Sequence, residues 1–403
     1  MTRALAAFLL IFGAAFPAGA APAAKPATGA PAAPEAAPPP TAFSPRETMD
    51  ALIDEGLRAI YNLDYAGSKA AFATLKRDFP DHPIGLYGLP TALWWELTND
   101  YHEDNPVLEK EFLATADETI AFARAQLKKG DPTGEIRLCL GGALGLKGRW
   151  DAIQGHWLAA YKNGKKAFDV QDEAIKSNPE LYDAYLGVGI FHYYVAVLPA
   201  AVKIFARMIF GGSKAQGLRE INLAKDKGRF SRTAALLFLV NLYVNNEKDP
   251  ATALALLREG RKEFPNSPFF HFAELLILDE ARDWSALRIG AEDFLARIRR
   301  ADRYYGKGRE HMGLFALGNS YLIEGDAGRA LDIYEDVLAN HHQQDRWITL
   351  TYLHRGMAYD LRGRRDLAVA DYHAVLDRRD VWELHDKARA LLKHPYQPPR
   401  KKR

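Results

Sequence analysis

The chain has 403 residues, of which 48% are hydrophobic and 26% charged, and its formal net charge is +2. A nearly balanced charge gives no global attraction for nucleic acid, so we expect no nucleic-acid partner. The single cysteine, Cys139, excludes an internal disulfide, and we expect it to be a buried apolar residue rather than a reactive thiol.

The N-terminal segment is expected to lie outside the folded body. Residues 1–20 have the pattern of a secretory signal peptide, because Arg3 precedes an apolar run at 4–16 and Ala-Gly-Ala at 18–20 is a suitable cleavage site. Residues 21–44 are rich in Ala and Pro, which predicts a disordered, extended tether. We therefore predict an exported protein, periplasmic or associated with the cell envelope. Retention of the apolar run as a membrane anchor is the alternative.

Helix-start signals recur from residue 44 onward. Ser44-Pro45-Arg46-Glu47 is a capping box with Pro at the first helical position. Four further pairs of a capping residue and Pro predict helix starts at Asn105-Pro106, Asp131-Pro132, Asn178-Pro179 and Asp249-Pro250. Between these markers apolar residues recur every three or four positions, without lasting two-residue alternation. The pattern predicts an all-α domain over residues 45–395.

Small residues twelve positions apart recur through this domain. In the clearest unit Gly318 is followed by Ala330, and Tyr334 comes sixteen residues after the Gly. Such a step is typical of helix hairpins that stack as repeats, with small residues where paired helices approach closely. The close-contact positions that we expect are Gly56, Ser68, Gly189, Ala253, Gly318, Ala330, Gly356 and Ala368.

These residues resemble the tetratricopeptide repeat, whose signature is Leu-Gly, a Tyr, an Ala, an aromatic residue, an Ala and a closing Pro. The two C-terminal units match most of these positions, and earlier units match about half. The resemblance implies a right-handed α-solenoid of some seven to nine helix pairs. It also implies an interaction role, without a cofactor or a bound metal.

The central section is similar to a narrower, divergent tetratricopeptide family. That family contains eukaryotic tetratricopeptide 39-type proteins, a yeast mitochondrial outer-membrane relative and exported bacterial members. The resemblance covers roughly residues 130–230 and implies an interaction role without known catalysis. Its most specific part is the succession Gly187-Val188-Gly189, Tyr193-Tyr194, Leu198-Pro199 and Gly211-Gly212.

An apolar insert at residues 193–216 interrupts the repeats. Lys203 and Arg207 are four residues apart, so they share one helix face beside apolar residues such as Phe205. One interpretation is an extra core hairpin that bends the solenoid. The other is a helix within 193–210 that contacts a partner or an anionic membrane surface.

Two aromatic runs have alternative interpretations as well. Trp94-Trp95 and the run at 269–272 have the spacing of core residues. If they line a concave face instead, Trp94 and Trp95 are the type of side chain that dominates a peptide interface.

Catalytic and metal-binding motifs are missing from the sequence. Asp100, His102, Asp104 and Glu111 fall at ligand positions of an EF-hand, but Asn105 replaces the required Gly, which favours a polar loop. We interpret the basic cluster at 297–303 and the basic tail at 396–403 as solvated charge, with contact to lipid headgroups or an acidic partner as the alternative. We expect no metal, no cofactor and no enzymatic activity.

The sequence thus predicts a non-catalytic protein–protein interaction scaffold of the cell envelope, with a partner segment in the concave groove of the solenoid. The alternative is a membrane-associated, lipid-contacting or envelope-biogenesis factor that uses the insert at 193–210.

Overall fold

A computed structural model describes residues 44–397, apart from 101–102, 198–212, 343–344 and 381. The expected signal peptide, tether and most of the basic tail lie outside the described residues. So do Lys203, Phe205 and Arg207 of the insert, and the expectations for all of these stay predictions.

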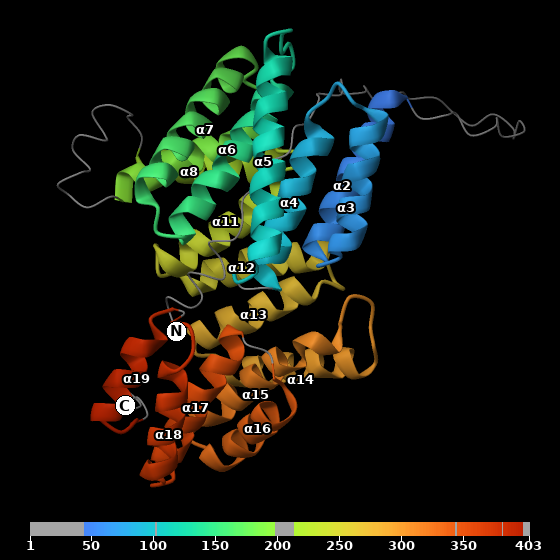
Figure 1. Cartoon of the computed structure of the whole chain (residues 1–403). Coiled ribbons are helices and arrows are strands. Elements are labelled where there is room, and N and C mark those ends of the chain that lie inside the picture. The colour runs from blue at the N-terminus through green and yellow to red at the C-terminus, as the bar shows by residue number, and fades with distance from the viewer. Residues whose placement is uncertain (1–43, 101–102, 198–212, 343–344, 381, 398–403) are drawn as a thin grey trace, which may run out of the picture.

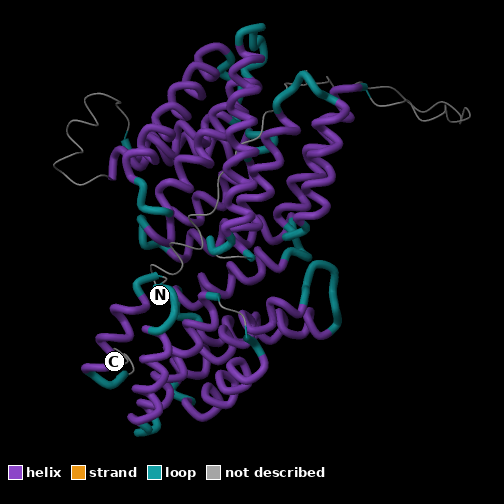
Figure 2. The backbone as a smooth tube through the Cα atoms, viewed as in Figure 1, coloured by secondary structure: helices purple, strands orange, loops and turns teal. Residues whose placement is uncertain are grey.

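The described residues form seventeen α-helices and a 3-10 turn (η1, Lys307–Arg309), with no strand among them (Figure 2). Consecutive helices pack in eight pairs, α2/α3, α4/α5, α6/α7, α8/α10, α11/α12, α13/α14, α15/α16 and α17/α18, and α19 follows the last pair. This arrangement confirms an all-α solenoid of helical repeats. The helices are α2 (Pro45–Tyr61), α3 (Tyr65–Asp78), α4 (Ile84–Asn99), α5 (Pro106–Leu127), α6 (Glu135–Ile153), α7 (Trp157–Ser177), α8 (Ala184–Val197), α10 (Lys214–Lys227), α11 (Arg232–Asn245), α12 (Pro250–Glu263), α13 (Pro268–Glu280), α14 (Trp284–Arg299), α15 (Glu310–Glu324), α16 (Ala327–Asn340), α17 (Arg346–Leu361), α18 (Arg365–Leu376) and α19 (Leu384–Lys393).

Three of the predicted helix starts are confirmed. Ser44 and Glu47 form the capping box of α2: the Ser44 hydroxyl accepts the Glu47 N–H at 3.3 Å, and the Glu47 carboxylate accepts the Ser44 N–H at 2.8 Å. Asn105 and Asp249 cap α5 and α12, and each side chain accepts the N–H three residues further on at 3.0 Å. These bonds satisfy backbone donors that have no partner inside the helix.

Two predicted helix starts are wrong. Helix α6 begins at Glu135, after Gly134 in a left-handed conformation (φ 80°), and the Asp131 carboxylate reaches forward to accept the Ile136 N–H at 3.1 Å. Asn178 ends α7 instead of starting a helix, and the next helix begins only at Ala184. A capping residue before Pro also suits a turn, and the sequence signal does not separate the two cases.

The glycines of the C-terminal hairpins make room for an aromatic ring. A Cβ atom at Gly318 would lie 2.5 Å from the ring of Tyr334, and one at Gly356 would lie 2.6 Å from the ring of Tyr372. Both Tyr side chains are fully buried. The step of sixteen residues therefore pairs a glycine on the first helix with the aromatic residue that fills its space from the second helix.

The same geometry is found in earlier hairpins, with one variation. A Cβ at Gly56 would lie 2.6 Å from Phe72, as in the C-terminal units. Between α8 and α10 two glycines meet backbone to backbone: a Cβ at Gly189 would lie 2.8 Å from the carbonyl oxygen of Gly217. The other close-contact positions are fully buried, namely Ser68, Ala253, Ala330 and Ala368.

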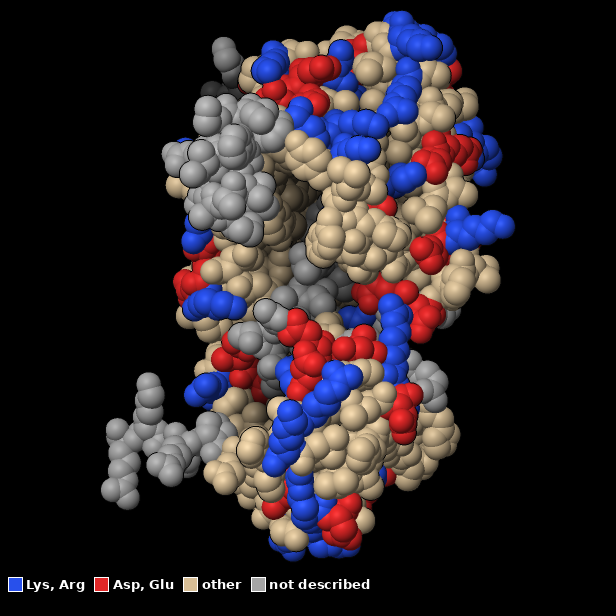
Figure 3. Space-filling view, turned by 60° about the vertical axis from the view of Figure 1, so that its left-hand side comes forward, with Lys and Arg blue, Asp and Glu red and all other residues tan. Residues whose placement is uncertain are grey.

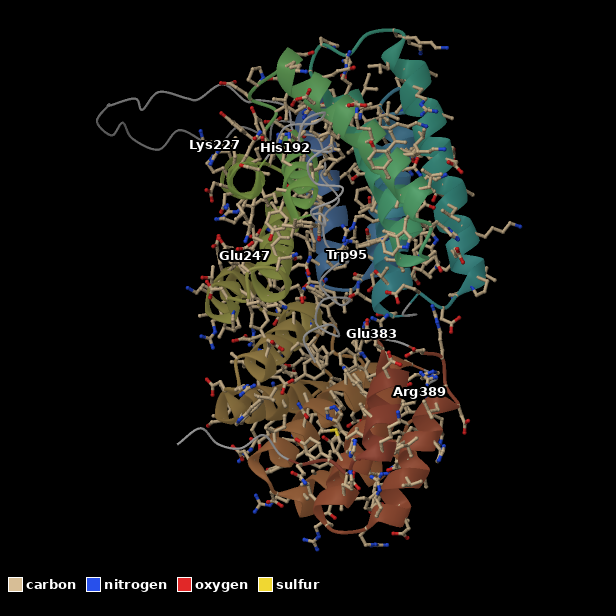
Figure 4. The ribbon with its side chains drawn as sticks, turned by 90° about the vertical axis from the view of Figure 1, so that its left-hand side faces the viewer. Trp95, His192, Lys227, Glu247, Glu383 and Arg389 are labelled. Atoms are coloured by element: carbon tan, nitrogen blue, oxygen red, sulfur yellow. The ribbon has the colours of Figure 1, made fainter. Side chains whose placement is uncertain are left out.

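The solenoid turns back on itself, and the ends of α2 and α4 contact the start of α13. The Ser267 hydroxyl donates to the carbonyl oxygen of Tyr61 at 2.5 Å, across 206 residues of sequence. The rings of Tyr61 and Phe264 lie 5.4 Å apart, as do those of Trp95 and Phe269. Figure 1 shows α13 crossing between the upright helices α2–α8 and the helices α15–α19 below. Figure 4 shows Trp95 in the middle of the molecule.

Ion pairs connect the same distant parts of the chain. Arg309 contacts Asp100 at 2.8 Å, and the buried Arg346 at the start of α17 contacts Glu103 at 2.5 Å, 243 residues earlier. Asp100 and Glu103 follow α4, so they tie its end to the C-terminal third of the chain. Among the described helices, none has the length and apolar character needed to cross a membrane.

Candidate functional site

The helices that face the inside of the solenoid are buried almost completely. In α13 every side chain from Pro268 to Asp279 is buried, and α4 and α11 are buried nearly as fully. Trp94 and Trp95 on α4 are 0% and 2% exposed. This burial favours the alternative interpretation, that the two Trp residues belong to the core.

The aromatic run of α13 belongs to the same core. The Phe272 ring meets the Trp347 ring edge-on at 4.9 Å, and Phe315 lies 5.8 Å from Trp347 on its other side. All three side chains are at most 3% exposed. These side chains of the inner helices are thus buried in the structure and belong to its core.

A buried polar chain crosses this inner face. The Asn319 amide donates to the Asp279 carboxylate at 2.7 Å, and its oxygen lies 2.9 Å from Nδ1 of His354. Burial raises the pKa of Asp279 to about 8 and lowers the pKa of His354 to about 3. Both groups are therefore held in their neutral forms near neutral pH. We interpret the chain as a structural link between α13, α15 and α17.

A second polar network holds α8 and α10, the helices on either side of the insert. His192 on α8 lies 2.7 Å from Glu220 on α10, and the Tyr193 hydroxyl donates to Glu247 after α11. Lys214 at the start of α10 contacts the same Glu247 at 2.6 Å. Figure 4 labels His192 and Glu247 on this side of the molecule. The network shows that residues 193–197 and 214–216, predicted as part of the insert, belong to the helix pair.

An exposed apolar surface lies at the start of α7. Trp157 and Leu158 are 72% and 67% exposed, and Tyr161 is 51% exposed. Together with Lys162 they form a surface that we call the α7 patch. Trp157, Leu158 and Lys162 also line a shallow hollow with His156. The spacing of these residues places them on one side of the helix.

The patch is exposed because α7 is longer than its neighbour. Helix α7 has 21 residues and α8 has 14, and the stacked rings of Phe168 and Phe191, 4.4 Å apart, mark where the two helices pack. The first half of α7 packs on α6 through small residues instead: a Cβ at Gly148 would lie 3.1 Å from the backbone nitrogen of Gly164. The α7 patch lies beyond this contact, at the N-terminal end of the helix.

Other exposed large apolar residues are single. Val107 is 80% exposed at the start of α5, and Ile289 is 66% exposed on α14. On the face shown in Figure 3, positive and negative side chains alternate over the described surface. Sequence reasoning missed the α7 patch, because Trp157, Leu158 and Tyr161 have a spacing that fits core residues equally well.

Comparison with known proteins gives matches among solved structures alone. No family model and no curated protein matches the chain. A tetratricopeptide repeat protein from Parabacteroides merdae ATCC 43184 is similar over 86% of this chain and 98% of its own, with 12% identity and a TM-score of 0.29. A human IFIT1 dimer with PPP-AAAA is similar over 86% of this chain and 85% of its own, with 16% identity and a TM-score of 0.39.

Both TM-scores are below 0.5, so the fold assignment depends on the hairpins themselves. The narrower resemblance of residues 130–230 to the tetratricopeptide 39-type family stays a prediction. The described residues form eight helix pairs, and in three of these pairs a glycine receives an aromatic ring from sixteen residues later, which makes this chain a tetratricopeptide-like helical-repeat protein.

Proposed function

We propose that the protein is a non-catalytic binding scaffold of the cell envelope, which holds a protein partner at the α7 patch. The observation that carries this proposal is the exposure of the adjacent Trp157 and Leu158, at 72% and 67%, whereas Trp94, Trp95, Trp150 and Trp347 are at most 2% exposed. A few side chains, most often Trp, Tyr and Arg, supply most of the binding energy at protein interfaces. The envelope location is supported by the signal-like pattern of residues 1–20.

The charges beside the patch favour a partner with acidic flanking residues. Lys162 and Lys166 are exposed on the same half of α7, whereas Lys165 contacts Asp169 one turn further on. An apolar helix or extended segment with neighbouring Asp or Glu would bury the patch and meet these lysines. The proposal thus replaces the concave groove by the outer end of α7 as the partner surface.

A photo-crosslinking amino acid at position 158 tests this surface in cells. We expect a discrete protein adduct from Leu158 and none from Ile289, which is 66% exposed on a different helix and is the matched control. An adduct of the same size from both positions, or none from position 158, would contradict the proposal.

The double variant Trp157→Ala/Leu158→Ala tests the energetics. Both side chains are mostly exposed, so stability should change by less than about 0.5 kcal/mol, while affinity for the crosslinked partner falls at least about tenfold. Ile289→Ala should change neither quantity. Unchanged affinity in the double variant would assign the contact to another surface.

Contact with an anionic membrane surface is the second candidate function. The neighbouring lysines favour it, because Lys beside Trp, Tyr and Leu is typical of helices that lie in the lipid headgroup region. If this candidate holds, the intact protein should float with phosphatidylglycerol vesicles. Flotation should then be lost in Trp157→Ala/Leu158→Ala or in Lys203→Glu/Arg207→Glu. An intact protein that fails to float would remove this candidate.

A further inference from the structure

Arg149, near the end of α6, lies inside the solenoid between two aromatic residues from distant helices. Its guanidinium carbon is 4.7 Å from the ring centre of Trp94 on α4 and 6.0 Å from that of Phe238 on α11. Such contacts with aromatic faces stabilise a guanidinium. These ring contacts do not use the N–H groups of Arg149, which point outward in the plane of the guanidinium.

Those N–H groups are buried and have no hydrogen-bond acceptor. Nη1 and Nη2 of Arg149 are both buried without a partner in the described part of the molecule, and so is Nε1 of Trp94. All of these groups are donors. Leaving a buried donor without an acceptor costs the folded state about 1–3 kcal/mol of stability, and more when the donor is charged.

No carboxylate compensates the charge of Arg149 within the described residues. Burial lowers the pKa of Arg149 to about 10, and the groups that act in the opposite direction are the hydroxyls of Tyr194 and Tyr87. The side chain therefore keeps its positive charge at neutral pH. A cation in such surroundings requires a counter-ion that the chain itself does not supply.

The buried Arg346 and the partly buried Arg355 are both paired with a carboxylate. Arg346 contacts Glu103, and Arg355 contacts Asp371 with two hydrogen bonds of 2.8 and 2.7 Å. At these two places a carboxylate of the described chain accepts hydrogen bonds from the guanidinium and neutralises its charge. Arg149 differs from these two in having aromatic rings in place of the carboxylate.

We propose that Arg149 binds a small oxyanion, a phosphate or a carboxylate, with Trp94 supplying a further N–H donor. The planar guanidinium offers two parallel donors, which match the two oxygen atoms of an oxyanion. The oxyanion can be a small molecule or an acidic group of a larger ligand. This site is independent of the α7 patch and of the function proposed above.

Thermal unfolding of the full chain tests the site, with inorganic phosphate and acetate as separate probes at constant ionic strength and sodium concentration. A ligand that binds the folded state raises Tm in a concentration-dependent manner. We expect a rise for phosphate, for acetate or for both, and the arm that responds identifies the class of ligand. Equilibrium dialysis of the responding probe should give one bound anion per chain.

Arg149→Met should remove the rise, and in anion-free buffer it should be at least as stable as the parent protein, because the unpaired charge is gone. Arg149→Lys keeps the charge but loses the planar fork, so it should bind about tenfold more weakly. Arg303→Met is the matched control, because Arg303 is exposed and lies 4.8 Å from the ring of Tyr304. It should respond to the probes as the parent protein does.

Two results would overturn the proposal: no rise in Tm with either probe in the parent protein, or an equal rise in the parent protein and Arg149→Met. If Arg149→Met does not fold, dialysis on the parent protein and on Arg149→Lys decides. Equal binding by these two proteins would place the anion elsewhere.

Discussion

At the scale of single residues, the fold depends on pairs in which a glycine receives an aromatic ring. The close-contact positions were predictable from the sequence, because the steps of twelve and sixteen residues recur in several units. The kind of contact at each position, ring against backbone or backbone against backbone, was not predictable. At Gly318 the ring of Tyr334 packs against the backbone of the first helix. At Gly189 and Gly217 the backbones of the two helices pack directly against each other. Spacing alone does not distinguish these two contacts.

Gly318→Ala should destabilise the protein by about 1–3 kcal/mol, because the new Cβ would lie 2.5 Å from the buried Tyr334 ring. Gly164→Ala is the control, because a methyl group added at that helical glycine would meet no atom of a neighbouring described residue within 4 Å. There the substitution should stabilise by about 0.5–1 kcal/mol, since alanine is the better helix former. Urea unfolding of both variants measures the difference, and equal effects would contradict the packing.

Asp279 should make stability fall with rising pH. Its pKa is raised from 3.8 to about 8 in the folded protein, so the folded state holds a proton that the unfolded state releases. Its contribution is complete below pH 4 and is lost as the pH rises to 8. His354, with its pKa lowered from 6.5 to about 3, contributes with the opposite sign between pH 3 and 6.5. Of these two groups, only Asp279 still changes the stability with pH above pH 6.5.

The variant Asp279→Asn isolates that effect, because the amide keeps an oxygen acceptor for Asn319. Between pH 6.5 and 8 the parent protein should lose about 1–2 kcal/mol of stability that the variant does not lose. Chemical denaturation at several pH values measures both curves. Parallel curves would show that Asp279 does not take up a proton on folding in this range.

At the scale of helices, length decides what is exposed. The 21 residues of α7 extend past the 14 of α8, and the α7 patch lies on the part of α7 that α8 does not cover. Helix starts at Ser44, Asn105 and Asp249 were predictable because their side chains cap the backbone locally. The starts near Asp131 and Asn178 were not, because the same residue pairs begin turns when tertiary packing requires them.

The ion pair between Arg346 and Glu103 tests the contact between the first and last thirds of the chain. Arg346→Met would leave Glu103, whose side chain is only 15% exposed, without its cation, and we expect a loss of stability of about 3–5 kcal/mol. Arg389→Met removes an exposed pair with Asp386 within α19 and should change stability by less than about 0.5 kcal/mol. Urea unfolding midpoints compare the stability of the two variants. Equal losses of stability would show that the Arg346–Glu103 pair does not hold the two ends of the solenoid together.

At the scale of the whole molecule, the solenoid was predictable and the contact between its distant turns was not. Local repeats specify each hairpin, but the contact of Ser267 with Tyr61 joins residues 206 positions apart and leaves no periodic signal. Trp95 and Phe272, which belong to helices on the inside of the solenoid, are buried. The partner surface that we propose is on the outside, at the α7 patch, where Trp157 and Leu158 are exposed.

Hydroxyl-radical footprinting of the tryptophans tests this central claim most directly. In the purified full chain, Trp157 should be oxidised fastest, whereas the buried Trp94, Trp95 and Trp347 should be protected. Addition of a cell-envelope extract should protect Trp157 and leave the other rates unchanged. If the three inner tryptophans are oxidised as fast as Trp157, or if the extract protects them and not Trp157, the partner surface is the inner face and the account is wrong.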